Sequence, residues 1–469
     1  MKKYLIWILL LAGIICGFFA TFYGITAFVA IIAVLTGCGI ILSDYERATY
    51  LLGAYSVIDF GIRSVSDLLG GIWDELFLIL LIGLWILKWI LYRKEEGFKM
   101  TPLDMPVFIF ITAMVFVLIV NSPDFKISLE GFRAVVQYIL WYFVVIQLLR
   151  TEKGARNLCI FFVLVAFVLA LHGVYQYIIG VEMPAGWVDS KEAGVRTRVY
   201  SILTSPNIFG CLMTLASPIA FSFVFSMKKI KSKVFFAFAT CVMLLSLLFT
   251  FSRGAWIGFM VAAFVYVFIK DKRFFIPIII GAILVIAFVP SVSNRITYML
   301  SSEYIESSLR GGRLVRWATG LEMLKSNPFV GVGLGHFGGA VAMNHDLSYL
   351  VGVQVEKTFY MDNYFLKTAV ESGLLGLGTF AILMYQVIIN SLRTIRITVK
   401  KELRELEIGI LAGLVGVICH NFVENIFEVP MMTSCFWLLV AVMMHLWYLN
   451  YHKKVDLSEN SDVQTTETK

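Results

Sequence analysis

Long apolar runs recur along almost the whole chain, and they constrain its fold more than any other feature. One crossing of a bilayer takes about 20 mostly apolar residues. Hydrophobic residues make up 59% of the 469 in this chain and charged residues 15%, whereas soluble domains carry roughly 45–50% and about 25%. The runs do not alternate with polar residues, which disfavours an outer-membrane barrel. We therefore expect an all-α polytopic membrane protein and exclude a soluble enzyme, a disordered chain and a single-span receptor.

The hydropathy pattern predicts about 12–14 transmembrane helices, each roughly as long as a bilayer is thick. A weaker span, Ala48–Val65, contains Asp59 and Arg63. The clear spans lie near residues 4–21, 24–42, 76–92, 105–120, 131–149, 158–179, 207–227, 234–251, 254–269, 274–290, 365–391, 405–423 and 431–449.

Lysine and arginine gather in every second loop, which makes those loops cytoplasmic by the positive-inside rule. Counting from them, both termini are cytoplasmic if Ala48–Val65 crosses, which favours 14 helices; 12 and 13 remain open. The basic loops hold Arg93/Lys94/Lys99, Arg150/Lys153/Arg156, Lys228/Lys229/Lys231/Lys233, Lys270/Lys272/Arg273, Arg393/Arg396/Lys400/Lys401/Arg404 and Lys453/Lys454.

Four regions follow from this pattern. Residues 1–290 and 362–450 form transmembrane helices, and residues 291–361 form a long extracytoplasmic loop with an amphipathic helix. Residues 451–469 form a polar cytoplasmic tail that we expect to be disordered. The seven cysteines are scattered singly without CxxC spacing, which predicts neither a disulfide framework nor a metal site.

Basic residues on the outer side need an explanation, because outward-facing loops are normally poor in them. Arg253 is the clearest case, since Phe251-Ser-Arg-Gly254 joins two apolar spans with too few residues for a loop. Its guanidinium either snorkels to the headgroups or binds an anion presented by a lipid. Gly254 would allow that ligand a close approach. The other outer basic residues are Lys191, Arg196, Arg198, Arg295, Arg310, Arg313, Arg316, Lys325 and Lys357.

The long outer loop contains a predicted amphipathic helix that begins at Arg313 and ends before Asn327-Pro328. We expect it to lie at the membrane surface with Arg313 and Arg316 facing headgroup-level phosphates, which guanidinium groups bind well. The alternative is a solvated basic face packed on lipid. Apolar residues recur at helical spacing at Leu314, Trp317, Leu321 and Leu324.

A glycine-rich stretch, Gly331-Val-Gly-Leu-Gly-His336, follows this helix. It superficially resembles a dinucleotide-binding loop, but it lacks the preceding strand and the required spacing. We therefore expect neither a nucleotide nor a nucleic-acid partner.

Two carboxylates, Asp362 and Glu371, follow the point where the long outer loop ends and the next apolar span begins. Asp362 is at a position where it could cap the next helix or act in a site. Glu371 lies inside the apolar span, where a carboxylate should be partnered, and arginine is the obvious candidate. A further polar cluster, His420 to Asn425, marks the outer end of the penultimate span.

Four motifs in this order resemble the O-antigen ligases and the related O-antigen and exopolysaccharide polymerases. The resemblance covers roughly residues 195–380. The motifs are Arg198-Val-Tyr-Ser-Ile-Leu-Thr-Ser-Pro-Asn207, Phe251-Ser-Arg-Gly-Ala-Trp256, Gly312-Arg-Leu-Val-Arg-Trp317 with Asn327-Pro-Phe-Val-Gly-Val-Gly-Leu-Gly335, and Asp362-Asn-Tyr-Phe-Leu366 with Glu371-Ser-Gly-Leu-Leu-Gly376.

This resemblance implies a glycosyltransferase-C-like enzyme of the bacterial cytoplasmic membrane that needs no metal and no cofactor. It would transfer a glycan from undecaprenyl diphosphate to an acceptor hydroxyl on the outer face. By position, Arg253 and Arg313 would bind the diphosphate and take part in catalysis, with Arg198 and Arg316 assisting.

This sequence differs from the family at the position where a catalytic base is expected. Ligases of this family usually have His-Asn where this chain has Asp362-Asn363, and that histidine is proposed to assist the acceptor hydroxyl. Here Asp362 would be the base, or His336 or His345 would replace it. Asn363, Glu371 and His336 would support the site.

We weigh four hypotheses for the function. The leading hypothesis is a polymerase that joins lipid-linked repeat units, with membrane lipids, a lipid-linked acceptor glycan and a chain-length regulator as partners. The alternative is a ligase that moves a finished glycan to lipid A core, wall polymer or protein. A third hypothesis is a flippase or transporter, which would place charge near the midplane of several helices, often with repeats. Here the charge gathers at one face instead. A structural scaffold is the remaining alternative.

Overall fold

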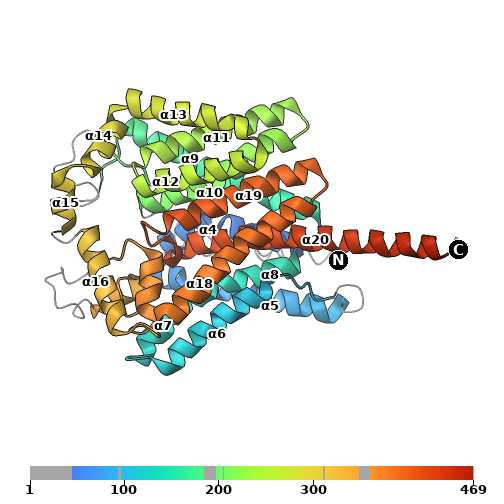
Figure 1. The fold of residues 1–469 in the computed structure, drawn as a ribbon, viewed down its shortest axis with the longest axis horizontal. Coiled ribbons are helices and arrows are strands. Elements are labelled where there is room, and N and C mark those ends of the chain that lie inside the picture. The colour runs from blue at the N-terminus through green and yellow to red at the C-terminus, as the bar shows by residue number, and fades with distance from the viewer. Residues whose placement is uncertain are drawn as a thin grey trace, which may run out of the picture.

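Long helices lie roughly side by side in the protein and form one bundle (Figure 1). This computed structural model describes residues 45–92, 97–183, 197–203, 205–309, 312–347 and 360–467. The spans predicted at 4–21 and 24–42 lie outside these ranges, as do Lys191, Arg196, Arg310 and Lys357. Within them the chain is helical and has no β-strand.

The helices follow one another with short connections. Before residue 200 they are α2 (Tyr45–Ala48), α3 (Tyr50–Gly53), α4 (Tyr55–Val65), α5 (Asp67–Tyr92), α6 (Asp104–Val120), α7 (Phe125–Val136), α8 (Leu140–Leu148) and α9 (Glu152–Ile179). After it they are α10 (Pro206–Ser226), α11 (Ile230–Phe249), α12 (Arg253–Lys270), α13 (Phe275–Phe288), α14 (Pro290–Met299), α15 (Ser302–Leu309), α16 (Arg313–Ser326), α17 (Ala340–Asn344), α18 (Tyr364–Ile397), α19 (Lys401–His420) and α20 (Pro430–Glu467).

The predicted fold class is confirmed. Eight helices in the described part of the chain are long and apolar enough to cross a membrane, or up to nine if the bent pair α13 and α14 counts as one span. The apolar α6 is shorter, and α19 has a charged first turn. Each clear span predicted within the described ranges coincides with helical structure.

The weak span Ala48–Val65 differs from its prediction, because the structure divides it among α2, α3 and α4. The longest of these, α4, has 11 residues, whereas a crossing takes about 20. Its polar residues bond to each other and to α5: Arg63 Nε lies 2.9 Å from Asp59 Oδ2, and Trp73 Nε1 donates to Asp59 Oδ1 at 2.8 Å. The count of 14 helices depended on this span as one continuous crossing.

The C-terminal tail also differs from its prediction. Residues 451–467, expected to be disordered, continue α20 beyond the bundle (Figure 1). Extending an existing helix needs no new nucleation, which is the costly step in helix formation. Polar composition alone therefore did not end the helix.

Helix α19 packs between α10 and α12 through small residues. A Cβ atom on Gly258 of α12 would lie 2.7 Å from the Gly416 carbonyl oxygen of α19, and one on Gly413 would lie 2.4 Å from that of Leu215 in α10. Such close approach of backbones is how membrane helices associate. Because α19 runs antiparallel to both neighbours, its end meets the beginnings of α10 and α12.

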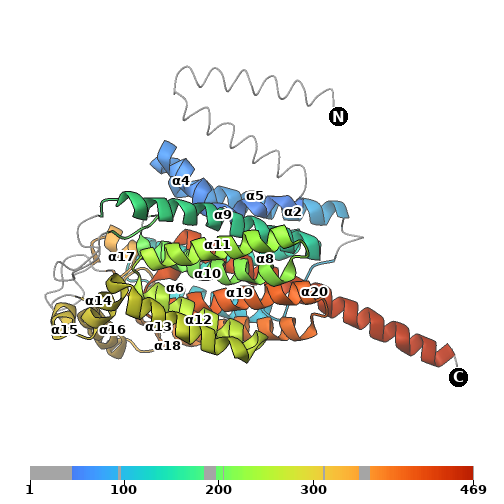
Figure 2. The same ribbon diagram turned by 90° about the horizontal axis from the view of Figure 1, so that it is seen from above.

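The two ends of the bundle carry different sets of loops. Ion pairs join loops that we predicted to be cytoplasmic: Lys228 with Glu402 at 3.4 Å, and Lys270 with Glu405 at 2.5 Å. Helix α20 leaves the bundle at this end, and α14 to α17 lie at the opposite end (Figures 1 and 2). The lysine-rich loops and the segment that carries the outer arginines of α14 and α16 thus lie at opposite ends of the bundle.

Helix α18 is broken at Gly373, which has φ 67° and ψ −169°. The stretch from Pro328 to Gly333 fills the break: Val332 N donates to the Val370 carbonyl oxygen at 2.8 Å, and Leu374 N to that of Pro328 at 2.7 Å. The glycine-rich stretch thus packs against a helix by its backbone, which gives it a role other than the nucleotide binding we rejected.

Candidate functional site

A pocket of about 280 Å³ opens at the end of the bundle that carries α14 to α17. Its lining combines the beginnings of α10, α12 and α16 with parts of α14 and α15 and the turn after α19. Basic and acidic side chains dominate it: Arg198, Arg253, Arg295, Arg313, Arg316, Asp362 and Glu424. Side chains far apart in the sequence therefore form one strongly cationic site.

Three helices direct their N-terminal ends at the pocket. Helix α10 begins after Ser205, whose hydroxyl accepts a hydrogen bond from Asn207 N at 3.2 Å. Helix α12 begins after Ser252, which caps it, and α16 begins after Gly312. The unpaired N–H groups and the positive dipole at such ends favour anions.

The turn before α12 places Arg253 at the first helical position. Phe251 adopts φ 49°, an uncommon value for a bulky side chain, and this lets α11 and α12 reverse direction within Thr250, Phe251 and Ser252. The guanidinium carbon of Arg253 lies 5.2 Å from the centre of the Tyr304 ring, a cation–π distance.

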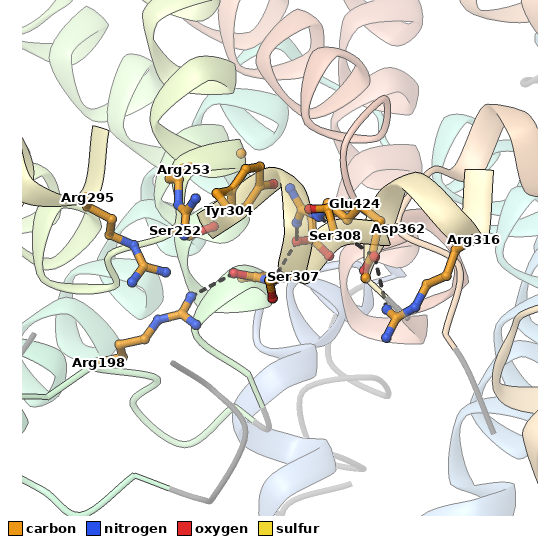
Figure 3. Close-up of a pocket in the computed structure, with 14 residues that line it drawn as sticks. Arg198, Ser252, Arg253, Arg295, Tyr304, Ser307, Ser308, Arg316, Asp362 and Glu424 are labelled. Carbon is orange, nitrogen blue, oxygen red and sulfur yellow. Dashed lines mark hydrogen bonds and ion pairs between the residues drawn. The ribbon is translucent and has the colours of Figure 1, made fainter. Parts of the chain in front are cut away.

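Arg198 and Arg295 are almost fully buried, at 6% and 5% exposure. Arg198 is fixed by the fold, since its Nε donates to the Thr250 carbonyl oxygen and its Nη2 to Asn207 Oδ1, both at 2.9 Å. Figure 3 shows Arg198, Arg253 and Arg295 directed toward the same part of the pocket. Their convergence concentrates positive charge where an anion could bind.

Across the pocket, the two arginines of α16 contact the two carboxylates. Arg313 Nη2 lies 2.5 Å from Glu424 Oε1, and its Nε lies 3.7 Å from Asp362 Oδ2. Arg316 Nη1 donates to Asp362 Oδ2 at 3.0 Å and to the Tyr360 carbonyl oxygen at 3.1 Å. Burial lowers the pKa of Arg313, but Glu424 and Asp362 outweigh that effect and raise it.

The pKa of the Glu424 carboxyl is raised toward neutral pH. Burial raises its pKa to about 7, and Asp362 adds to the rise, while Arg313 opposes it. Asn207 Nδ2 donates to Glu424 Oε1 at 2.7 Å. Such a carboxyl exchanges its proton near neutral pH.

The structure brings together five of the predicted site residues: Arg198, Arg253, Arg313, Arg316 and Asp362. Asn363 instead caps α18, because its side chain accepts a hydrogen bond from Leu366 N at 2.9 Å. The capping role that we considered for Asp362 therefore belongs to its neighbour.

Glu371 lies outside the pocket lining, and its partner is not the expected arginine. Lys367, one turn earlier on α18, places its Nζ 2.7 Å from Glu371 Oε2. Glu428 adds a second carboxylate 3.7 Å from the same Nζ. The other Glu371 oxygen accepts a hydrogen bond from Phe337 N at 3.2 Å, which ties the glycine-rich stretch to α18.

The histidines considered as replacement bases also lie elsewhere. His336 is buried, with its Nδ1 2.9 Å from the Leu334 carbonyl oxygen, and His345 Nε2 lies 2.9 Å from Glu130 Oε2. Neither lines the pocket. The carboxylates that do are Asp362 and Glu424.

Sequence reasoning missed Glu424, Asn207 and Tyr304 as site residues, and it noted Arg295 only as an outer basic residue. A signal existed for Glu424, because it belongs to the polar cluster at the outer end of a span, where ionisable residues tend to be functional. Asn207 stood in a motif of the resemblance without an assigned role. Nothing in the sequence placed Tyr304 beside Arg253.

The pocket suits an anion better than a cation. Across the described ranges, no three His, Cys, Asp or Glu side chains gather as a metal-ligand set would. Five guanidinium groups against two carboxylates leave the lining with an excess of positive charge.

Comparison with known proteins agrees with this geometry. No curated protein matches the chain. Residues 237–381 match the family described as O-antigen ligase, and this stretch contains every pocket arginine except Arg198. It supports a role in surface-polysaccharide biosynthesis as a ligase or polymerase. The resemblance to the O-antigen ligase and polymerase family is therefore confirmed over residues 237–381.

Proposed function

We propose that this integral inner-membrane protein is a polymerase of surface polysaccharide. It transfers a glycan from undecaprenyl diphosphate to the hydroxyl of a lipid-linked acceptor glycan. The reaction takes place on the outer face of the bacterial cytoplasmic membrane, and the C-terminus is cytoplasmic. The observation that carries the proposal is the convergence of five arginines and three helix N-termini on one pocket.

The arginines suit the donor because the reaction releases a diphosphate. When the glycosidic bond breaks, negative charge grows on the leaving oxygen, and fixed cations stabilise that transition state more than the ground state. Guanidinium groups also bind phosphate oxygens in pairs. In this proposal Arg253 and Arg313 clamp the diphosphate, and Arg198, Arg295 and Arg316 surround it.

The acceptor hydroxyl must lose a proton during transfer. A carboxylate can take it when placed within hydrogen-bonding reach, and Asp362 is the candidate from the sequence. The pocket contains Glu424 as a second carboxylate.

A ligase reaction is the second candidate, and the family description favours it. Donor and chemistry are shared, and the acceptor would be lipid A core, wall polymer or protein. Asp362, which stands where ligases of the resembling family have histidine, supports the polymerase. Purified protein given only a lipid-linked repeat unit should produce a ladder of repeats if it is a polymerase, and no ladder if it requires a ligase acceptor.

The arginine pocket can be tested in purified protein reconstituted with a polyprenyl-diphosphate-linked glycan. We expect Arg253→Ala and Arg313→Ala each to lower the transfer rate by about 100-fold to 1,000-fold, as removal of one transition-state donor does. Lys325→Ala is the matched control, because Lys325 is exposed on the same helix α16 and should not matter. Normal transfer by both arginine variants would contradict the proposal.

A further inference from the structure

Glu424 is held in place by the backbone around it. It lies in the turn after α19, and its carbonyl oxygen accepts a hydrogen bond from Tyr364 N at 3.2 Å. The buried side chain of Asn421 stabilises the same turn by accepting hydrogen bonds from Ile426 N and Phe427 N, both at 3.0 Å. The carboxylate is therefore fixed relative to the beginning of α18.

The Glu424 side chain joins the two walls of the pocket. Its Oε1 atom accepts hydrogen bonds from Asn207 of α10 at 2.7 Å and from Arg313 of α16 at 2.5 Å. The ionisable groups that act on it or feel its charge include Arg313, Asp362, Arg198, Cys211 and Tyr360.

Asp362 is placed differently. It contacts both arginines of α16, at 3.0 Å for Arg316 and 3.7 Å for Arg313. Arg316 is also bound by the Tyr360 carbonyl oxygen. Asp362 is thus suited to orient the cations of α16.

We propose that Glu424 is the catalytic base of the transfer and that Asp362 is a positioning residue for Arg313 and Arg316. This inference rests on the proposed function. In the step, the acceptor oxygen forms a bond to the anomeric carbon as the bond from that carbon to the diphosphate oxygen breaks. The departing polyprenyl diphosphate takes the electron pair, and the hydroxyl proton passes to the Glu424 carboxylate.

The environment of Glu424 fits this role. A base works best when its pKa lies near the working pH, and burial brings that of Glu424 to about 7. Arg313 favours the charged form of the carboxylate and opposes the effect of burial, and a bound diphosphate would offset the charge of this arginine. Donor binding should therefore raise the proton affinity of Glu424 just when a base is needed.

The pH dependence of the rate tests the assignment. A base must be deprotonated, so activity should fall as the pH drops below the pKa of Glu424. The profile of kcat/KM for the donor reports the free enzyme, and that of kcat reports the donor complex. We expect the acid limb of kcat/KM near pH 7, and the acid limb of kcat at higher pH because the bound diphosphate adds negative charge.

Paired variants separate the two carboxylates. Glu424→Gln should lower kcat by about 100-fold or more and abolish the acid limb. Asp362→Asn should keep the limb and mainly raise the donor KM, because it loosens the arginines. A Glu424→Gln variant with wild-type rate and limb, or an Asp362→Asn variant without the limb, would overturn the assignment.

A third variant keeps the test valid if Glu424→Gln does not fold. Asn207→Ala removes a hydrogen bond to the charged form of Glu424, which should move the acid limb to higher pH. An unmoved limb would overturn the assignment.

Failure of the proposed function would give a different result, because wild-type protein would then not turn over the diphosphate-linked donor, or the arginine variants would stay active. Inactive arginine variants beside a fully active Glu424→Gln would refute only the base.

Discussion

At the residue scale, two adjacent polar residues have separate tasks. Asn363 bonds to the backbone of α18, and Asp362 faces the arginines of α16. From the sequence we considered Asp362, and not Asn363, as a residue that could cap the helix. The structure separates them because only the residue directly before the first helical position, Tyr364, can act as the cap.

We expect Asn363→Ala to lower the free energy of unfolding by about 1 kcal/mol, which is typical for loss of an N-cap. Its transfer activity should remain measurable. Thermal unfolding of the detergent-solubilised protein would measure the loss, and Asn363→Ser should recover most of it since serine also caps. Equal stability of the alanine variant and wild type would show that the cap has no effect.

Some pocket residues could be predicted from the sequence and others could not, for a physical reason. Arg253 was conspicuous because a cation between two apolar spans is costly. Glu424 acquires its environment from Asn207, 217 positions away, and from Arg313. No local pattern encodes such a contact, since it arises when α19 packs beside α10.

At the element scale, hydropathy located the long helices because burial in lipid requires an almost continuous apolar surface. It could not locate the break in α18, which depends on one glycine and on a segment that inserts there. The polar residues of α4 likewise looked like parts of a span, yet they bond with α5.

The break in α18 requires glycine at position 373. A Cβ atom there would lie 2.2 Å from the backbone of Phe329, and the φ of 67° is unfavourable for other residues. We expect Gly373→Ala to destabilise the protein by at least about 2 kcal/mol. Gly378→Ala on the same helix is the control, because nothing lies within 4 Å of its Cβ position, and similar melting temperatures for the two variants would contradict the argument.

At the scale of the whole molecule, the loops predicted to be cytoplasmic meet at one end of the bundle, and the pocket lies at the other. Lys228 pairs with Glu402 at the first, and α14 to α17 surround the second (Figure 2). The sequence predicted this polarity from its alternating loops. It could not predict which loops share the pocket, because that depends on the order in which the helices pack.

Cysteine labelling tests the orientation. In a protein without its native cysteines, Lys325→Cys on α16 should react with a membrane-impermeant maleimide from outside. Lys228→Cys should react only after the membrane is opened, since its loop is predicted to be cytoplasmic. Both side chains are exposed, so the reverse labelling pattern would show that the pocket faces the cytoplasm.

The pocket lies where α10 and α12 begin, which is where their apolar spans end. A lipid keeps its phosphate groups at this level while its tail remains in the hydrocarbon. In the proposed reaction the lipid-linked donor would therefore reach the arginines by lateral diffusion, without being extracted from the bilayer. Encounter then becomes a two-dimensional search, and turnover should follow the surface density of the donor among the lipids rather than its concentration in the suspension.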